Sequence, residues 1–157
     1  MKINKTNAMR ILDSMNIYYD YATYESEDGK IDGVSVAQKT GQNPEAVFKT
    51  LVAIGQSKEF YVFCIPVEYE LNLKKAAKAS NEKNIEMLPL KDLTKTTGYI
   101  RGGCSPIAMK KQFKTFIDES AILQDNIFVS AGTIGIQIII KSDDLIKAID
   151  ATYADLI

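Results

Sequence analysis

The chain has 157 residues, carries a formal net charge of −1 and contains no histidine. Its length predicts one domain with a sizeable core, and its 46% hydrophobic and 25% charged residues are ordinary for a soluble globular protein. The lack of histidine excludes the usual Ser-His-Asp and Cys-His catalytic systems and histidine metal sites. Any catalysis must therefore use lysine, carboxylates, hydroxyls, backbone amides or the substrate itself.

Targeting signals and metal motifs are both missing from the sequence. Residues 1–16 alternate polar and apolar side chains instead of forming the continuous apolar stretch of a signal peptide. No apolar run approaches the length of a membrane span. We therefore expect a cytoplasmic protein with no membrane partner. Cys64 and Cys104 form no CxxC motif, which indicates neither a zinc cluster nor a disulfide framework, so no metal or cofactor is expected.

Apolar spacing and capping signals predict the elements of the first third of the chain. These elements are a helix over residues 5–16 capped by Thr6 or Asn7, a strand over 19–26, a helix over 36–40 capped by Ser35 and ended by Gly41, and a one-turn helix begun by Asn43-Pro44-Glu45.

The middle of the chain reads as a hairpin followed by two helical segments. Apolar strands over 47–54 and 59–67 flank a short polar turn, which is typical of a β-hairpin, and Cys64 is expected in its core. A helix is predicted over 73–79. A second short helix is predicted over 89–97, where Gly98 stops it.

Three further strands and a terminal helix complete the predicted fold. The strands cover residues 113–120, 125–132 and 134–141. The helix covers 143–156, begins after a cap at Ser142 and buries a stripe of Ile146, Ile149 and Tyr153. The expected class is α+β, with residues 1–157 forming a single domain around a mixed, largely antiparallel central sheet of about six strands flanked by short helices.

Candidate chemistry gathers in three stretches. In GYIRGGCSP, residues 98–106, the glycines form either a tight turn or a loop whose backbone approaches a ligand closely. Lys49 interrupts the apolar strand FKTLV and points either to solvent or into a cleft, where it would stabilise a developing negative charge. The stretch VSAGTIG contains Ser130 and Gly132, and its simplest interpretation is a hairpin turn.

The overall charge argues against a protein that coats nucleic acid by bulk attraction. A local basic patch stays possible, and its candidates are Lys74, Lys75, Lys78, Lys110 and Lys111. The first three are more typical of a solvated helix face.

The ordered blocks of the chain resemble one known family. NPEAVFKTLV, TGYIRGGCSP followed by Lys110-Lys111, VSAGTIG and DLIKAIDATYADL resemble, in order and spacing, the YbaK/EbsC family of free-standing prolyl-tRNA editing proteins, of the Cys-tRNA-Pro deacylase type. With LKKAAKA and the opening helix followed by TYE, the resemblance covers nearly the whole chain. It implies a single YbaK-like aminoacyl-tRNA editing domain. It also implies mischarged tRNA-Pro as substrate and a transient complex with prolyl-tRNA synthetase.

The resemblance also implies roles for individual residues. Lys49 and Gly102 match the catalytic positions. The matching substrate-binding positions are Tyr24, Gly103, Ser105, Pro106, Ser130, Gly132 and Gln137. The loop from Gly102 to Pro106 would hold the carbonyl and ribose end of the ester through backbone amides. Gln137 stands where the YbaK type has aspartate, and this departure leaves both the effect of the change and the choice of substrate open.

In the YbaK type, the thiolate of the misattached cysteine attacks its own ester, so the resemblance implies catalysis without histidine or cofactor. Three alternatives stay open: an Ala-tRNA-Pro deacylase that uses water, a non-catalytic module that binds the aminoacyl-tRNA end or prolyl-tRNA synthetase, and a phosphate-ester hydrolase that uses Lys49. The sequence leaves the preferred amino acid (cysteine or alanine), the oligomeric state and the affinity for free tRNA undetermined.

Overall fold

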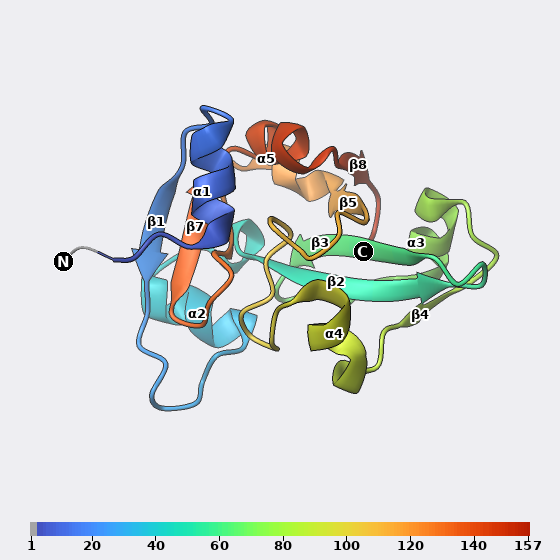
Figure 1. The fold of residues 1–157 in the computed structure, drawn as a ribbon, viewed down its shortest axis with the longest axis horizontal. Coiled ribbons are helices and arrows are strands. Elements are labelled where there is room, and N and C mark those ends of the chain that lie inside the picture. Colours follow the sequence, from blue (N-terminus) through green and yellow to red (C-terminus); the bar gives the residue numbers. More distant parts are fainter. Residues whose placement is uncertain (1–2) are drawn as a thin grey trace.

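The computed structural model describes residues 3–157, in which eight strands form two sheets (Figure 1). The predicted α+β class is confirmed, but the strands divide between two sheets instead of joining one central sheet. The smaller sheet is antiparallel, and its strands run in the order β1 (Asp20–Thr23), β7 (Ile136–Ile140), β6 (Ile127–Ser130).

The larger sheet is mixed. Its strands run in the order β4 (Ile85–Met87), β2 (Phe48–Gly55), β3 (Phe60–Pro66), β5 (Lys114–Asp118), β8 (Thr152–Ala154). The pairs among β4, β2 and β3 are antiparallel, whereas β5 lies parallel to both β3 and β8. The predicted hairpin is confirmed, with Leu51 opposite Phe63. A single parallel bridge between Val47 and Phe128 joins the two sheets.

Short helices pack around the two sheets, and several begin where the sequence predicted. Thr6 caps α1 (Asn7–Ser14), and Asn43 caps η1 (Pro44–Ala46). The remaining helices are α2 (Gly33–Thr40), α3 (Leu73–Ser80), η2 (Leu90–Asp92), α4 (Leu93–Thr97), η3 (Glu119–Leu123) and α5 (Ser142–Ile149). No helix within the described residues is long and apolar enough to cross a membrane.

Two predicted helix caps were wrong. Asp32, not Ser35, caps α2, because its carboxylate accepts hydrogen bonds from the amide and the hydroxyl of Ser35. Ser142 makes no capping bond to α5; its hydroxyl instead pairs with the Tyr153 hydroxyl at 2.6 Å. Asp32 makes the usual bond from an N-cap side chain to the amide three residues later, whereas Ser142 pairs with a side chain outside its helix.

The C-terminus also differs from its predicted helix. The helix α5 ends at Ile149, Asp150 adopts the left-handed conformation, and the chain returns as β8. The buried carboxylate of Asp118 accepts the amide of Leu156 at 2.9 Å, which fixes this return. Residues 119–123 are a 3₁₀-helix, so the strand predicted over 113–120 is shorter, and the short strand β4 was not predicted.

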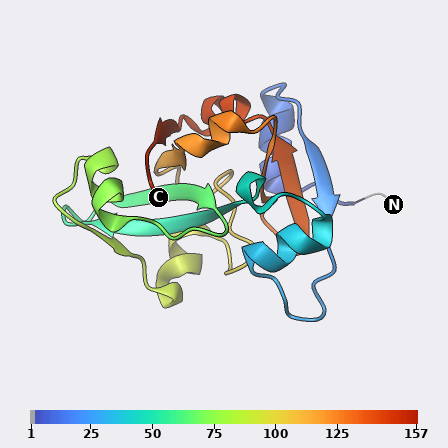
Figure 2. The ribbon, with the colours of Figure 1, turned by 180° about the vertical axis from the view of Figure 1, so that it is seen from behind.

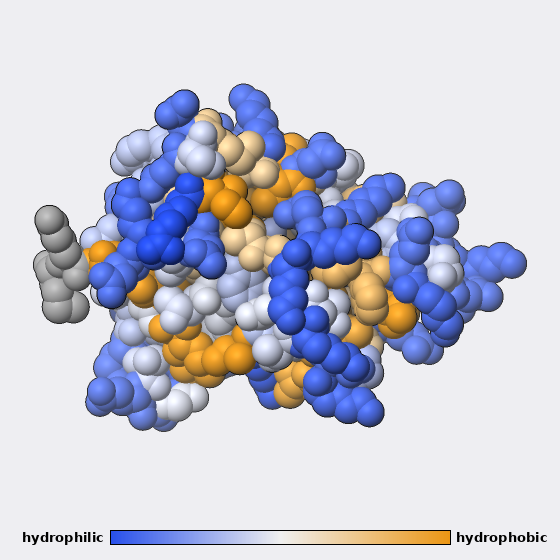
Figure 3. Space-filling model, in the orientation of Figure 1, coloured by the Kyte–Doolittle hydropathy of each residue, from blue (hydrophilic) through white to orange (hydrophobic). Residues whose placement is uncertain are grey.

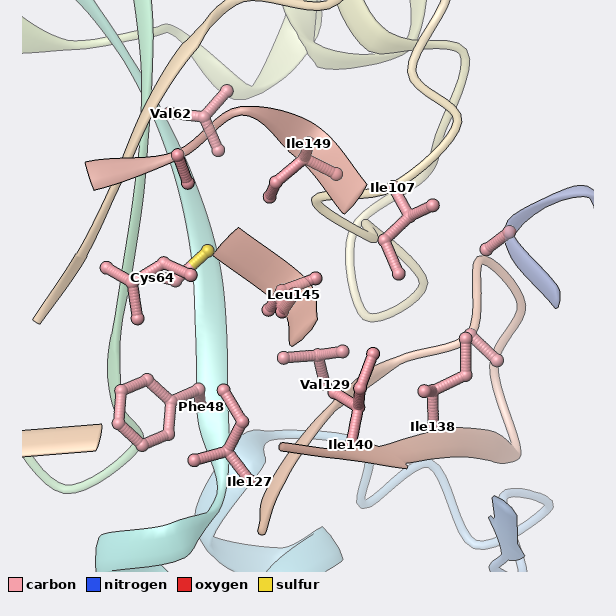
Figure 4. Packing of buried hydrophobic residues seen from close by; sticks show 14 of the residues in the cluster. Phe48, Val62, Cys64, Ile107, Ile127, Val129, Ile138, Ile140, Leu145 and Ile149 are labelled. Atoms are coloured by element: carbon pink, nitrogen blue, oxygen red, sulfur yellow. The ribbon is translucent and has the colours of Figure 1, made fainter. Parts of the chain in front are cut away.

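Strand alternation produces two cores, one on each side of the larger sheet. Figure 4 shows Val62, Cys64 and Phe48 facing Ile127, Val129 and Ile138 of the smaller sheet, with Leu145 between them. On the other side, α3 covers Phe63 and Ile65 with its alanines, and Figure 2 shows this helix from behind. The two sheets therefore meet along β2 and β6, where the chain leaves room for a site.

Candidate functional site

A small cavity of about 120 Å³ lies where the two sheets meet. Its polar lining comes from the end of β1, the start of β2, the glycine-rich loop and the paired ends of β6 and β7. The lining residues are Tyr24, Ile31, Gly33, Val36, Val47, Phe48, Lys49, Thr50, Val67, Gly102, Cys104, Ser130 and Gln137.

The structure brings together only some of the residues singled out from the sequence. Tyr24, Lys49, Gly102, Ser130 and Gln137 all line this cavity. The other four lie beside it without lining it: Gly103, Ser105, Pro106 and Gly132. Among these four, Ser105 is fully buried, and Gly103 and Pro106 are also buried.

Gly102 occupies a position that no other residue fits without strain. Its φ of +85° is in the left-handed region, where a Cβ atom meets the backbone. A Cβ there would also lie 2.7 Å from Cδ1 of Ile31, well inside van der Waals contact. The glycine therefore lets the loop backbone border the cavity directly.

The loop satisfies some of its own amides and leaves others open. The amide of Gly103 donates to the carbonyl of Ile100 at 3.0 Å, and the amide of Ile107 donates to the hydroxyl of Ser105 at 3.2 Å. Across residues 3–157, the amides of Gly102 and Cys104 have no protein acceptor. Ser105 and Gly103 therefore hold the loop in shape. Among the loop amides without an acceptor in the described residues, those of Gly102 and Cys104 belong to residues that line the cavity.

Gly132 supports the glycine-rich loop through a contact with Tyr99. Its φ is +98°, and a Cβ atom there would lie 2.9 Å from Cε1 of Tyr99. The Tyr99 hydroxyl in turn donates to the carbonyl of Ile107 at 2.5 Å. The amide of Gly132 donates to the hydroxyl of Ser130 at 3.1 Å, so this turn packs Tyr99 against the glycine-rich loop.

Lys49 is half-buried at the edge of the cavity. Burial lowers the pKa of its ammonium below 10.5, and the negative charge of Glu70 partly opposes that shift. Lys49 also borders a second cavity, which is lined by Glu70, Leu71 and Met87. Within the described part of the chain its ammonium forms no ion pair. A flexible four-carbon stem allows this cation to serve a ligand in the first cavity.

Gln137 presents an unusual buried amide to the cavity. It sits on the central strand β7, paired with Ala22 on one side and Ser130 on the other. The residue is 6% exposed, and its Oε1 atom has no hydrogen-bond partner among residues 3–157. An unpaired buried acceptor costs free energy, so this oxygen is suited to receive a donor from a bound molecule.

The two thiols of the chain are held in their protonated form. Burial raises the pKa of Cys104, which lines the cavity, to about 11, although a hydrogen bond with Thr97 opposes the shift. Burial raises the pKa of Cys64 to about 12. Because a thiolate is the nucleophilic form, neither cysteine is prepared for attack at neutral pH.

Sequence reasoning did not identify the apolar wall of the cavity. Ile31, Val36, Val47 and Val67 come from a loop, a helix and two strand ends, and no local pattern marks them as neighbours. Only the tertiary fold brings them together. Within residues 3–157, no group of three or more histidine, cysteine or acidic residues could hold a metal ion.

The chain is similar to proteins of one family over most of its length. The model of the aminoacyl-tRNA editing domain matches residues 32–148. The chain is 43% identical, over 97% of its own length and 93% of the relative's, to an Enterococcus faecalis protein whose name proposes a Cys-tRNA(Pro)/Cys-tRNA(Cys) deacylase, EbsC.

Solved structures share the fold at low sequence identity. A crystal structure described as that of a proposed trans-editing enzyme for prolyl-tRNA synthetase superposes with a TM-score of 0.83 at 18% identity, and 98% of each chain is covered. Another, of a protein described as hypothetical, gives a TM-score of 0.85 at 16% identity, covering 94% of this chain and 96% of that one. Together with the family match, these likenesses place the α+β architecture among known folds.

Proposed function

Because the chain belongs to the aminoacyl-tRNA editing domain family, we propose that it is a free-standing deacylase that clears mischarged tRNA-Pro, above all Cys-tRNA-Pro. The name of the 43% identical relative supports this choice of substrate. The need for such an enzyme is physical: a site shaped for proline rejects a smaller side chain by only about 1–3 kcal/mol per missing methylene. A second site of different shape must then remove the errors.

The candidate cavity offers a group for each polar part of an aminoacyl ester. The unpaired amides of Gly102 and Cys104 donate to the ester carbonyl oxygen, on which negative charge develops during attack. The free Oε1 of Gln137 accepts a hydrogen bond from the α-ammonium group. The surrounding aliphatic wall admits a small side chain and excludes water.

The reaction itself uses the thiol of the misattached cysteine. Its thiolate sulfur forms a bond with the ester carbonyl carbon, and the bond from that carbon to the ribose oxygen breaks. The thiol proton ends on the ribose hydroxyl, so this step consumes no water and leaves a cyclic thioester, which water opens later. Holding the thiolate and the ester in the right orientation lowers the activation free energy of such an intramolecular attack by about 7–11 kcal/mol.

Lys49 supplies the positive charge for this step. A cation near the substrate thiol favours its ionised form, and the same cation stabilises the charge that builds on the carbonyl oxygen. The lack of an ion pair leaves the ammonium free to do either. Raised pKa values keep Cys64 and Cys104 as thiols, so the protein's own sulfur atoms do not compete.

The observation that carries the proposal is that the amides of Gly102 and Cys104 and the buried Oε1 of Gln137, all without a partner in residues 3–157, belong to residues that line one small cavity. The test is single-turnover deacylation of Cys-tRNA-Pro and Pro-tRNA-Pro by excess protein. We expect rapid loss of cysteine and no loss of proline beyond the uncatalysed rate. Binding of Cys-tRNA-Pro without any deacylation would instead favour the non-catalytic module.

A transient complex with prolyl-tRNA synthetase belongs to the same proposal. The net charge of −1 predicts weak, salt-sensitive affinity for free tRNA. Release of mischarged tRNA next to the editing protein would overcome this weakness by raising its local concentration. Adding the synthetase to the deacylation assay should therefore lower the tRNA concentration needed for half-maximal rate.

A further inference from the structure

One stretch of the chain carries a local excess of positive charge. Residues 88–117 contain six lysines and arginines, and their only acidic residue is Asp92. Because the whole chain has a net charge of −1, all the other residues together are strongly acidic. Charge separation of this kind produces a local positive potential that bulk composition conceals.

Three of these cations lie near one another on the surface around α4 and the loop that follows it. Side chains of Lys95, Arg101 and Lys110 are all exposed. Lys110 lies across Gly98, because a Cβ atom there would be 3.2 Å from the Lys110 Cγ, and its ammonium donates to the carbonyl of Lys95 at 3.4 Å. In Figure 3 a band of hydrophilic side chains crosses the face that carries α4 and the following loop in Figure 1.

A neighbouring cavity adjoins the candidate site on this side. This third cavity has a volume of about 200 Å³ and shares Thr50, Gly102 and Cys104 with the first. Its other lining residues include Leu90 and Arg101. A molecule held at the amides of Gly102 can therefore extend past Arg101 onto the basic face.

We propose that the surface formed by Lys91, Lys95, Arg101, Lys110 and Lys111, here called the basic face, binds the phosphodiester backbone of the nucleic acid strand that carries the ester. The inference rests on the proposed function, because an aminoacyl ester on a terminal ribose brings phosphates next to the site. Exposed lysines and arginines supply most phosphate contacts, and such contacts set orientation without reading sequence. Among these five cations, only Lys95 forms an ion pair within the described residues, with Asp92 at 2.8 Å.

The net negative charge of the remaining residues also favours binding at the basic face. Because the rest of the chain has more acidic than basic residues, a polyanionic strand is favoured at the basic face. The strand is therefore aligned so that its aminoacylated end lies over Gly102. The basic face positions the substrate and takes no part in the chemistry.

The test compares two double variants that remove the same charge. Lys95→Ala/Lys110→Ala removes two cations from the basic face. Lys74→Ala/Lys78→Ala removes two exposed lysines from α3, which covers the opposite side of the larger sheet. Affinity for uncharged tRNA-Pro is measured at several salt concentrations by fluorescence anisotropy, and the KM and kcat for Cys-tRNA-Pro are measured separately.

The basic-face variant should bind uncharged tRNA-Pro about fivefold or more weakly, and the slope of log affinity against log salt should flatten by about one per lysine. Its loss in deacylation should fall on KM, while the α3 variant should match the wild type. Equal weakening by both variants would overturn the proposal, since bulk charge would then explain binding. Unchanged tRNA binding with lost binding to prolyl-tRNA synthetase would also overturn it and assign the basic face to a protein partner.

This binding measurement separates the inference from the proposed function. Uncharged tRNA-Pro carries no ester, so its affinity does not depend on any deacylase activity. If the protein binds tRNA through the basic face but does not deacylate Cys-tRNA-Pro, the inference stands and the proposed function is wrong. If the Lys95→Ala/Lys110→Ala variant deacylates Cys-tRNA-Pro and binds tRNA with wild-type salt dependence, the proposed function stands and the inference is wrong.

Discussion

At the scale of single residues, the site depends on groups that the protein leaves unsatisfied. The Oε1 of Gln137, the amides of Gly102 and Cys104 and the ammonium of Lys49 have no strong partner within the described residues. Leaving such groups unpaired costs stability in the free protein. A bound ester would recover that cost by pairing with all of them at once, which is how preorganised donors favour a transition state.

Lys49 gives the first prediction. Lys49→Ala should lower the single-turnover rate on Cys-tRNA-Pro by about a hundredfold or more, because a preorganised positive charge is lost. Stability, measured as the urea midpoint, should hold or rise, since a half-buried cation is removed. A variant that deacylates at the wild-type rate would remove Lys49 from the mechanism.

The lowered pKa of Lys49 adds a pH test of the same role. The protonated ammonium is the active form, so the wild-type rate should fall as pH rises through a pKa below 10.5. Lys49→Arg should lose this decline, because a guanidinium stays charged at all accessible pH values. Rates are compared after subtracting uncatalysed ester hydrolysis, and an identical decline in both proteins would assign it to another group.

Gly102 has a matched control in the same chain. Gly102→Ala and Gly29→Ala both place a Cβ at positive φ, +85° and +75°. Only the first Cβ meets a neighbour, since no described atom lies within 4 Å of the second. Each should lose about 1–2 kcal/mol of unfolding free energy from backbone strain, with a further loss at Gly102 from Ile31. Deacylation should fall sharply in Gly102→Ala alone. Equal, near wild-type activity in both variants would make the loop purely structural.

At the scale of elements, the sequence predicted correctly those helices and turns whose geometry depends on neighbouring residues. Periodicity and turn residues predicted the β2–β3 hairpin and the stop at Gly98 correctly, and Thr6 was one of the two caps proposed for the first helix. The terminal helix was wrong because ATYADL continues a helical pattern, whereas its strand depends on pairing with β5 far away in sequence. In the same way, the sequence did not indicate which loop amides are hydrogen-bonded. The Gly103 amide donates to the carbonyl of Ile100, whereas the Gly102 amide has no acceptor in the described residues.

The C-terminal strand gives an element-scale prediction about stability. The buried Asp118 carboxylate accepts amides from Ser120 at 3.1 Å and Leu156 at 2.9 Å. Asp118→Ala leaves both donors unpaired and should cost about 1–3 kcal/mol in the free energy of unfolding. The exposed neighbour Glu119 serves as the control, and Glu119→Ala should change stability little. Urea denaturation measures both, and equal midpoints would show that β8 is not held through Asp118.

At the scale of the whole molecule, the site exists because two sheets meet at one bridge. Tyr24, Ser130 and Gln137 come from the smaller sheet and Lys49 from the larger one. Sequence blocks named the polar members of this group, because each stands in a short, recognisable stretch. The junction itself, with its wall of Ile31, Val36 and Val67, follows only from tertiary packing and could not be read from spacing.

The most direct test of the central claim compares Cys-tRNA-Pro with Ser-tRNA-Pro in single-turnover deacylation. The two substrates differ only by sulfur and oxygen in the side chain. A few per cent of free thiol is ionised at neutral pH, whereas an alcohol is essentially not. If the substrate thiol is the nucleophile, Cys-tRNA-Pro should be cleared rapidly and Ser-tRNA-Pro hardly faster than without protein. Equal rates for the two would contradict the account and indicate attack by water.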